Sequence, residues 1–461
     1  MNKDTMRVST RQSRRTFLKR LGAGAAILSL APVAGGPWVR GQETLLIGMA
    51  NPLATFFGEA AEKALRMAIN EINAAGGIRV GDTSVQLDLI VSDSAGRADQ
   101  APLALQDLVG RGADVLTGFF FSEELIGSLP SIPILRKLFL GTGASTPAAT
   151  IQVSADYDNY KFFFRIGPIN SFLILQAAIT FAVGFLERGL GWDSIVLMAE
   201  DAAWTQPITD GFPVLLQAFG SKLQVVDTIR YAEDTTDFTS LFNRAVSAME
   251  GRVGGIYTLM AHTGSRPTAQ WAAQQVPLPL VGINVQAQDG RFDQLTQGAS
   301  ESVVTFTSGA RAPITEKTIP FVDKFAAFTE FKPDVTIPSY NAFASYDALY
   351  LLKEAIENAG VLPKDEASTT AVIQALETYG KRDDEGNPTN LFVGTSGNLG
   401  FYERGETGVT PLRPDQDFPH DVRYGPGLAE GIWIQWQGGQ QEVIFPPNLA
   451  TASFVLPPWL R

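Results

Sequence analysis

Residues 45–78 read LLIGMANPLATFFGEAAEKALRMAINEINAAGGI, and this stretch decides the fold of the chain. Its first six residues form a short apolar run, which is typical of a buried strand in a parallel sheet. Residues 59–74 then have helical periodicity. Apolar side chains recur there at positions i, i+3, i+4 and i+7, namely Leu65, Ala68, Ile69 and Ile72. The glycine pair 76–77 ends the helix. The stretch therefore predicts a strand followed by a helix, the opening unit of an α/β fold.

The same alternation continues along the chain. Residues 85–92 and 115–118 are predicted strands with a predicted helix, 98–110, between them, and this βαβαβ order indicates a parallel sheet with helices on both faces. A second series has the same rhythm, with strands at 195–199, 223–228, 255–259 and 280–283 and helices at 208–219, 238–249 and 271–275. Later segments predict helices at 342–359 and 369–379 and a hairpin at 432–436 and 442–445. The chain therefore reads as one α/β lobe followed by another.

An uncharged stretch, residues 166–186, is the one later segment that resembles a membrane span. It contains Pro168, Gln176 and Thr180, which a lipid-facing helix would avoid. We interpret residues 172–186 as a helix buried against a sheet.

The carboxyl ends of the predicted strands carry the chemistry that points to a ligand site. In open α/β sheets, ligands bind beyond these ends. The segments concerned are rich in Gly, Ser, Thr, Asn and aromatic residues; they are 51–58, 119–124, 141–146, 200–204, 260–264 and 284–289. Hydroxyls and backbone N–H groups can replace water around a polar solute, and aromatic walls exclude bulk water. The sequence therefore predicts a cleft between two lobes that takes a small molecule.

Composition excludes several classes of function. The chain has 461 residues, enough for two lobes, and no cysteine, so disulfides, thiolate metal sites and a lipidated cysteine are excluded. Of the 36 Lys and Arg residues, eight lie in residues 1–41, which hold one of the 48 Asp and Glu residues. The remaining chain therefore has a net charge of −19, which argues against nucleic acid and anionic membranes as partners.

The N-terminus has the pattern of an export signal. Residues 13–19 read SRRTFLK, an apolar run follows at 21–31, and small residues extend to Gly41. The paired Arg14 and Arg15 resemble the twin-arginine signal, whose pathway exports folded proteins. The apolar run is too short to span a bilayer. We therefore predict that residues 1–41 are removed and that the processed protein is periplasmic and does not span the membrane.

At this point the chain resembles a known family, the periplasmic branched-chain amino acid binding proteins and their amide- and urea-binding relatives. The resemblance covers most of residues 44–445. Its most specific motifs are Gly48-Met49-Ala50-Asn51-Pro52 and the A-x-x-x-I-N-A-x-G-G-I pattern of residues 68–78. The resemblance implies the type I periplasmic binding fold: two doubly wound parallel-sheet lobes of α/β class, joined by a three-crossing hinge.

The resemblance also implies the division into lobes. We place the three crossings near residue 166, at 305–308 and at 380–392. Lobe one is then 43–165 plus 310–380, and lobe two is 166–305 plus 392–450.

The family's binding residues carry over to six positions of this chain. Ser122, Ala144 and Thr146 match positions that hold a ligand carboxylate by hydroxyl and backbone N–H groups. Phe57 matches the aromatic wall of lobe one, and Trp204 matches the aromatic residue of lobe two that covers the ligand. Simpler structural roles remain open for these residues. Ser122 and Thr146 can cap helices, and Phe57 can be ordinary core.

The sixth position departs from the family pattern. Where amino-acid binders have an acidic partner for the α-ammonium group, this chain has Asn284, which can also be a turn residue. Ala261 stands where a second aromatic residue is expected. A buried charge without a counter-charge costs several kcal/mol. Either Glu123, Glu124 or Asp289 replaces the missing partner, or the ligand carries no ammonium group and is an amide, a urea-like solute or a carboxylate.

Taken with the resemblance, these residues predict a solute-binding protein that closes on a small polar ligand and delivers it to the permease subunits of an ABC importer, with no cofactor. Two alternatives stay open, a sensory ligand-binding subunit and an enzyme of the same fold. The chain has only two histidines, His262 and His420, and lacks the G-x-S-x-G and phosphate-loop motifs, so we expect no catalytic activity.

Overall fold

Strand β1 (Thr44–Asn51) lies within a six-stranded sheet whose order is β2-β3-β1-β4-β5-β6. The computed structural model of the protein describes residues 43–461, so the predicted signal at residues 1–41 lies outside the described residues. All neighbours in this first sheet pair in parallel except β2 with β3. The other strands are β2 (Ile78–Val80), β3 (Thr83–Asp93), β4 (Val115–Gly118), β5 (Phe139–Gly141) and β6 (Phe163–Arg165).

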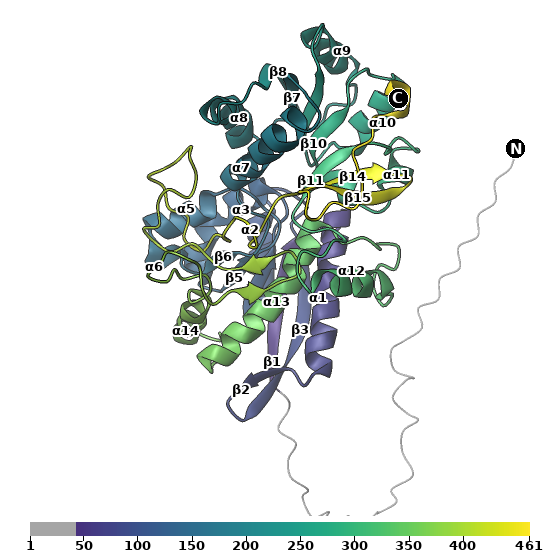
Figure 1. Cartoon of the computed structure of the whole chain (residues 1–461). Helices are drawn as coiled ribbons and strands as arrows, with labels where there is room; N and C mark the ends of the chain where they lie inside the picture. The colour runs from purple at the N-terminus through teal and green to yellow at the C-terminus, as the bar shows by residue number, and fades with distance from the viewer. Residues whose placement is uncertain (1–42) are drawn as a thin grey trace, which may run out of the picture. The chain divides into compact units, whose positions relative to one another are not determined.

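Helices cover the two faces of the first sheet. From β1 the chain passes to β3 on one side through α1 (Phe56–Ala74), and from β3 to β4 on the other side through α2 (Ala101–Gly110). Since such crossovers are right-handed, α1 and α2 lie on opposite faces. The predicted apolar set of α1 is buried. Helix α13 (Tyr340–Ala359) packs along α1, although more than 260 positions separate them in the chain (Figure 1).

The remaining helices of this region are short. They are α3 (Ser122–Ser128), η1 (Leu129–Ser131), α4 (Ile132–Leu135), α5 (Ala148–Ala155), α6 (Tyr157–Tyr160), α12 (Thr318–Ala327) and α14 (Glu366–Leu376).

A second parallel sheet has the order β10-β9-β7-β8. Its strands are β7 (Ser194–Glu200), β8 (Gln224–Tyr231), β9 (Gly254–Met260) and β10 (Leu280–Asn284). Its helices are α7 (Ser171–Phe181) with the π-turn η2 (Ala182–Glu187), α8 (Gln206–Ala218), α9 (Thr239–Ala248), α10 (Ser265–Ala273), η3 (Val285–Gln288) and α11 (Phe292–Leu295). The second α/β series is thus confirmed, although α10 begins six residues before the helix predicted at 271–275.

A small antiparallel sheet, β11-β14-β15, packs beside β10. The predicted hairpin is present as β14 (Ile432–Gln437) and β15 (Gln440–Phe445), and η4 (Pro458–Leu460) follows near the C-terminus. We predicted a crossing between the lobes at 305–308. In the structure, most of these residues belong to strand β11 (Val304–Thr307), which pairs with β14. The Trp433 ring of β14 stacks on Phe181 of α7, with ring centroids 4.4 Å apart. The α/β fold class with two parallel-sheet lobes is confirmed.

Residues 392–424 lie against the first sheet, whereas we predicted residues 392–450 in the second lobe. The backbone N–H of Arg165 in β6 donates to the His420 carbonyl at 2.9 Å. The His420 ring stacks on Phe164, with centroids 3.8 Å apart. The short strands β12 (Phe392–Val393) and β13 (Asn398–Leu399) belong to this segment, and Thr395 N–H donates to Asp347 of α13 at 2.8 Å. The same segment also contacts the second lobe, since the Phe418 ring lies 5.9 Å from Phe172 of α7 and Leu412 lies against Gly211 of α8.

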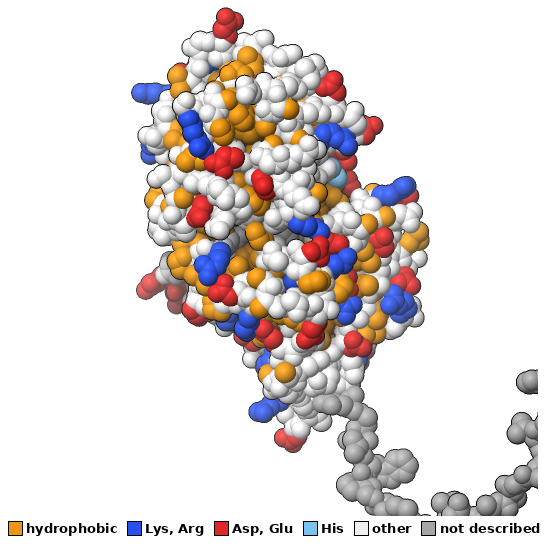
Figure 2. Space-filling view, turned by 90° about the vertical axis from the view of Figure 1, so that its right-hand side faces the viewer, with side chains coloured by type: hydrophobic (Ala, Val, Ile, Leu, Met, Phe, Trp, Pro, Cys, Tyr) orange, Lys and Arg blue, Asp and Glu red, His pale blue; other side chains and the backbone are white. Residues whose placement is uncertain are grey.

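Below, the first lobe means the first sheet with residues 310–424, and the second lobe means the second sheet with β11, β14 and β15. Among residues 43–461, no helix combines the length and apolar character that crossing a bilayer requires. Acidic and basic side chains are interspersed over the face shown in Figure 2, consistent with a solvated surface.

Candidate functional site

A cavity lies where the carboxyl ends of both parallel sheets meet. Its walls lie close together, and the space inside it that the centre of a water molecule can occupy is about 30 Å³. The first lobe contributes Phe120, Phe121, Ser122, Gly143, Ser145 and Tyr340. The second lobe contributes Ile174, Trp204, Ala261, Ile283, Val285, Gln288 and Phe306, and Pro168 lies in the first crossing. Strand ends line the cavity because parallel strands leave their last backbone groups and the following loops at one edge of each sheet.

Ser122 is one of the two predicted site residues that line this cavity. It is the first residue of α3, directly after β4, and its side chain is buried. Its Oγ accepts the backbone N–H of Thr146 at 3.1 Å, which ties the loop after β4 to the loop after β5. A hydroxyl that accepts one hydrogen bond still has its own proton to donate.

Trp204 is the other predicted residue that lines the cavity. It lies in the loop between β7 and α8, and its side chain is buried. Its indole Nε1 has no hydrogen-bond partner within residues 43–461. A buried N–H group without a partner is costly, so it is an available donor for a ligand acceptor.

Ala144 and Thr146 lie in the loop behind the cavity wall and are not among its lining residues. The Ala144 N–H donates to Phe119 O at 3.0 Å, and the Thr146 N–H donates to Ser122. The guanidinium of Arg165 donates to both of their carbonyls and forms an ion pair with Asp421 at 2.8 Å. The backbone groups predicted to hold a carboxylate are therefore bonded within the protein, and they shape the loop that carries Ser145.

Phe57 lies one layer behind the cavity. Its ring stacks on Phe120 with centroids 3.6 Å apart, and Phe120 in turn stacks on Tyr340 at 5.5 Å. Phe57 also borders a wider groove that adjoins the cavity through the shared residues Phe121 and Ala261. Its position supports the aromatic wall and the mouth of the cleft.

Asn284 is buried inside the second lobe and does not line the cavity. Its Nδ2 donates to Gly264 O and to Thr268 Oγ1, both at 3.2 Å. Its backbone N–H donates to Thr305 Oγ1 at 2.9 Å. These bonds join β10 to α10 and β11, so the side chain is committed to the fold of this lobe.

The acidic residues considered as replacements for a missing ammonium partner all have bonds within the protein, although Glu123 keeps one free oxygen. Glu123 Oε1 accepts the Ala203 N–H at 2.8 Å, whereas its buried Oε2 has no partner within residues 43–461. Asp289 pairs with Arg291 at 3.0 Å. Glu124 accepts the N–H groups of Phe120 and Phe121 and the Ser94 hydroxyl. Burial raises the pKa of Glu124 to about 7, although these hydrogen bonds oppose the shift. Glu124 therefore shapes the Phe120-Phe121 turn.

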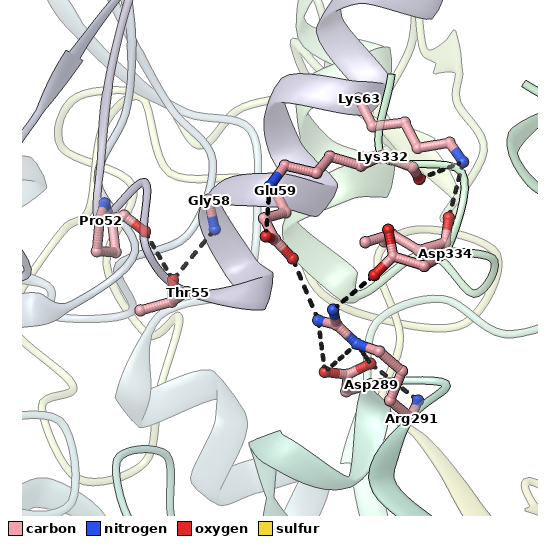
Figure 3. Close-up of polar contacts among 10 residues, drawn as sticks. Pro52, Thr55, Gly58, Glu59, Lys63, Asp289, Arg291, Lys332 and Asp334 are labelled. Atoms are coloured by element: carbon pink, nitrogen blue, oxygen red, sulfur yellow. Dashed lines mark hydrogen bonds and ion pairs between the residues drawn. The ribbon is translucent and has the colours of Figure 1, made fainter. Parts of the chain in front are cut away.

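Charged side chains bridge the lobes at the edge of the wider groove (Figure 3). The guanidinium of Arg291, from the second lobe, lies 3.2 Å from Glu59 of α1 and 3.0 Å from Asp334. Lys332 contacts the other oxygen of Glu59 at 2.7 Å. Hydrogen bonding to Asp289 and the charges of Asp289 and Glu59 raise the pKa of Arg291, so it stays charged. This group, called the Arg291 bridge below, joins the two lobes electrostatically.

His262 forms a further contact between the lobes. Its ring stacks on Phe121 of the first lobe with centroids 4.1 Å apart, and its Nδ1 lies 2.9 Å from Glu200. Burial by itself lowers the pKa of His262, but the hydrogen bond to Glu200 and the charges of Glu200, Glu233 and Glu123 outweigh burial and raise it. Within residues 43–461, no group of three or more His, Asp and Glu side chains is arranged to hold a metal ion.

Several lining residues were not singled out by sequence reasoning. Four of them lie in strand-end segments that the sequence did indicate: Phe120, Phe121, Ser145 and Gln288. The sequence therefore predicted the segments but not which of their residues line the cavity. Tyr340 begins α13 and Phe306 lies in β11, and neither follows a strand of a parallel sheet. No local signal marks these two residues as lining residues.

The comparisons with known proteins agree with this architecture. Residues 45–400 match the model of a protein family described as periplasmic binding protein. No curated protein matches the sequence. One similar solved structure is the branched-chain amino acid transporter substrate binding protein LivJ from Streptococcus pneumoniae in complex with isoleucine; its TM-score is 0.66 and its identity 17%, over 88% of this chain and 100% of that chain.

Two further solved structures are similar to this chain. The leucine binding protein LivK from Thermotoga maritima has a TM-score of 0.65 and 15% identity, over 87% of this chain and 97% of that one. An ABC transporter solute binding protein from R. palustris in complex with benzoate has a TM-score of 0.66 and 17% identity, over 90% of this chain and 99% of that one. At these identities the likeness concerns the fold.

Proposed function

Because the chain belongs to the periplasmic binding protein family, we propose that it captures one small ligand between its lobes and delivers it to the permease of an ABC importer. This family consists of substrate-binding proteins rather than enzymes. One observation carries the proposal: side chains from the strand ends of both lobes converge on a single cavity. A ligand that contacts both lobes stabilises the closed arrangement by its differential contacts, and closure then presents a paired surface to the permease.

Contacts between the lobes support closure as the mechanism. Glu123 with Ala203, the Arg291 bridge and the stack of His262 on Phe121 each join the two lobes. We propose a division into lobe one, residues 43–165 with 310–424, and lobe two, residues 166–305 with 432–461. The end of the first lobe at 424 replaces the predicted end at 380, because residues 392–424 bond to β6 and α13.

We propose Ser122 and Trp204 as direct ligand contacts, since both line the cavity. Thr146, Ala144 and Phe57 act behind them by holding the loop after β5 and the Phe120 ring. Asn284 acts by joining elements of the second lobe.

We propose further that residues 1–41 direct export by the twin-arginine route, on the basis of the SRRTFLK motif. Replacing Arg14 and Arg15 together by Lys should abolish accumulation in the periplasm, and fractionation of expressing cells measures this. The same replacement at Arg7 and Arg11 is the matched control. Unchanged export of the double variant would exclude this route.

A thermal-shift screen of the protein lacking residues 1–41 tests the binding function. A ligand that binds only the native state raises the melting temperature in a concentration-dependent way. Amino acids, amides, urea and carboxylates make up the panel. A saturable shift with one of these classes, absent in Trp204→Ala, supports capture in this cavity. A shift that Trp204→Ala retains in full would place binding elsewhere.

A further inference from the structure

We infer that the ligand has an aromatic body and one oxygen acceptor head group, as in an aromatic carboxylate or carboxamide, and that it carries no ammonium group. The inference rests on the proposed function and names the ligand class for the same cavity. It follows from the walls of the cavity, from the hydrogen-bonding state of its polar groups and from the charges around it.

The walls of the cavity are aromatic on both sides. Phe120, Phe121 and Tyr340 come from the first lobe, and Trp204 and Phe306 from the second. Phe120 is held in place between Phe57 and Tyr340 by ring stacking. Both faces of Phe120 are thus covered, and His262 covers one face of Phe121. Apolar aromatic walls from opposite lobes still suit a planar ring, which makes edge and face contacts with them and loses its hydration shell at closure.

The polar groups that remain available in the cavity are donors. Trp204 Nε1–H has no partner within the described residues, and Ser122 accepts the Thr146 N–H while keeping its own proton. Ser145 also has a hydroxyl in the cavity, and the neighbouring Ser171 hydroxyl donates to the Ser145 backbone carbonyl at 3.1 Å. An indole N–H and two hydroxyl protons together suit the oxygens of a carboxylate or carboxamide.

The amide acceptor of the cavity is already used. Gln288 Oε1 accepts the Tyr340 N–H at 3.0 Å, and its Nε2 donates to Phe306 O at 3.1 Å. The Tyr340 hydroxyl donates to Gly143 O at 2.9 Å. A bound ammonium group would therefore find neither a free carboxylate nor a free amide oxygen among these side chains.

No charged side chain lines the cavity among the residues that the structure describes. The nearby carboxylates Glu124 and Glu200 are bonded to backbone N–H groups, and Asp289 is bonded to Arg291. Glu123 accepts the Ala203 N–H through Oε1, and its buried Oε2 has no partner within the described residues, but Glu123 does not line the cavity.

A buried charge of either sign is unfavourable without compensation. The Trp204 N–H and the Ser122 hydroxyl can compensate the oxygens of a carboxylate or carboxamide, whereas no free carboxylate or amide oxygen of the described residues lines the cavity to compensate an ammonium group. The cavity therefore fits the des-amino analogue of an amino acid better than it fits the amino acid itself.

Isothermal titration with matched pairs tests this inference. The pairs are phenylalanine with 3-phenylpropionate and leucine with 4-methylpentanoate, and benzoate and benzamide compare the two head groups. We expect 3-phenylpropionate or one of the benzene derivatives to bind, with 3-phenylpropionate at least about tenfold tighter than phenylalanine (about 1.4 kcal/mol). Phenylalanine or leucine binding as tightly as its des-amino partner would overturn the ligand class and leave the binding function intact.

A second measurement tests the donor role of Trp204. Trp204→Phe keeps an aromatic face and removes the N–H group, so it should weaken the best aromatic ligand about tenfold. Trp459→Phe is the matched control, because the indole of Trp459 donates to Val276 O away from the cavity. Equal affinity of Trp204→Phe and wild type would overturn the proposed donor. If no compound of either panel binds, the ligand class and the binding function both fail.

Discussion

The carboxylate of Glu123 accepts a hydrogen bond from the backbone N–H of Ala203 at 2.8 Å, and this bond joins the two lobes. Glu123 lies in the first turn of α3, one residue after Ser122, and Ala203 precedes Trp204. The bond therefore links the residues next to the two proposed ligand contacts. Its formation brings the Ser122 hydroxyl and the Trp204 indole to the same cavity, which makes closure and ligand contact a single event.

The first prediction concerns this bond. Glu123→Ala should weaken the best ligand about two- to tenfold, because one hydrogen bond that favours the closed state is lost. Glu123→Gln keeps a carbonyl acceptor and should retain most of the affinity. Calorimetric titration measures both, with Asp201→Ala as the control, since Asp201 pairs with Arg230 inside the second lobe. Equal losses of ligand affinity in Glu123→Ala and Glu123→Gln would show that the acceptor oxygen of Glu123 does not contribute to closure.

The second prediction concerns the Arg291 bridge. Arg291→Ala should weaken ligand binding about two- to fivefold at low ionic strength, since partly exposed ion pairs contribute modestly. Salt screens such pairs, so the difference from wild type should shrink between about 0.05 M and 0.5 M NaCl. Arg244→Ala is the matched control, because Arg244 pairs with Asp227 within one lobe. A difference from wild type that salt leaves unchanged would contradict an electrostatic bridge.

The third prediction is a pH dependence from His262. The fold raises the pKa of His262 above its ordinary value of 6.5. The stabilisation from the protonated ring is therefore complete below pH 6.5 and is lost as the pH rises through the raised pKa. His262→Gln should lower the melting temperature by about 1–2 °C more at pH 5.5 than at pH 9. The groups facing the ring are Glu200, Glu233, Glu123 and Phe121. Melting curves of both proteins across this range measure the effect, and a constant difference would contradict it.

The fourth prediction concerns Asn284. Asn284→Asp should destabilise the protein by about 2–4 kcal/mol, because a carboxylate replaces the amide that donates to Gly264 O and Thr268. Denaturant unfolding measures this change, with Asn390→Asp at an exposed position as the control. The preference between an amino acid and its des-amino analogue should stay unchanged. A gain in amino-acid affinity would instead restore Asn284 to the role of an ammonium partner.

The sequence predicted most elements of both parallel sheets because their apolar periodicity is strong. It placed a strand end at 141–146 without giving bounds for β5, and it missed β6; each of these strands has three residues and is too short to show a period. It also assigned residues 392–424 to the second lobe alone, whereas they contact both lobes. Their contacts with β6 and α13 depend on pairing across long separations, such as His420 with Phe163, and a local pattern does not report which sheet a segment joins.

By itself the sequence determined the α/β series, the two lobes and the strand ends at which Ser122 and Trp204 lie, since periodicity and strand direction are local properties. Only the tertiary structure decided which of the candidate polar groups face the cavity. Asn284, Thr146 and Glu124 have the right chemistry for a ligand, yet none of them lines the cavity, and the Asn284 Nδ2, the Thr146 N–H and the Glu124 carboxylate are bonded within the protein. Hydrogen-bond partners are chosen by proximity in space, and proximity between distant parts of the chain exists only once both lobes have folded.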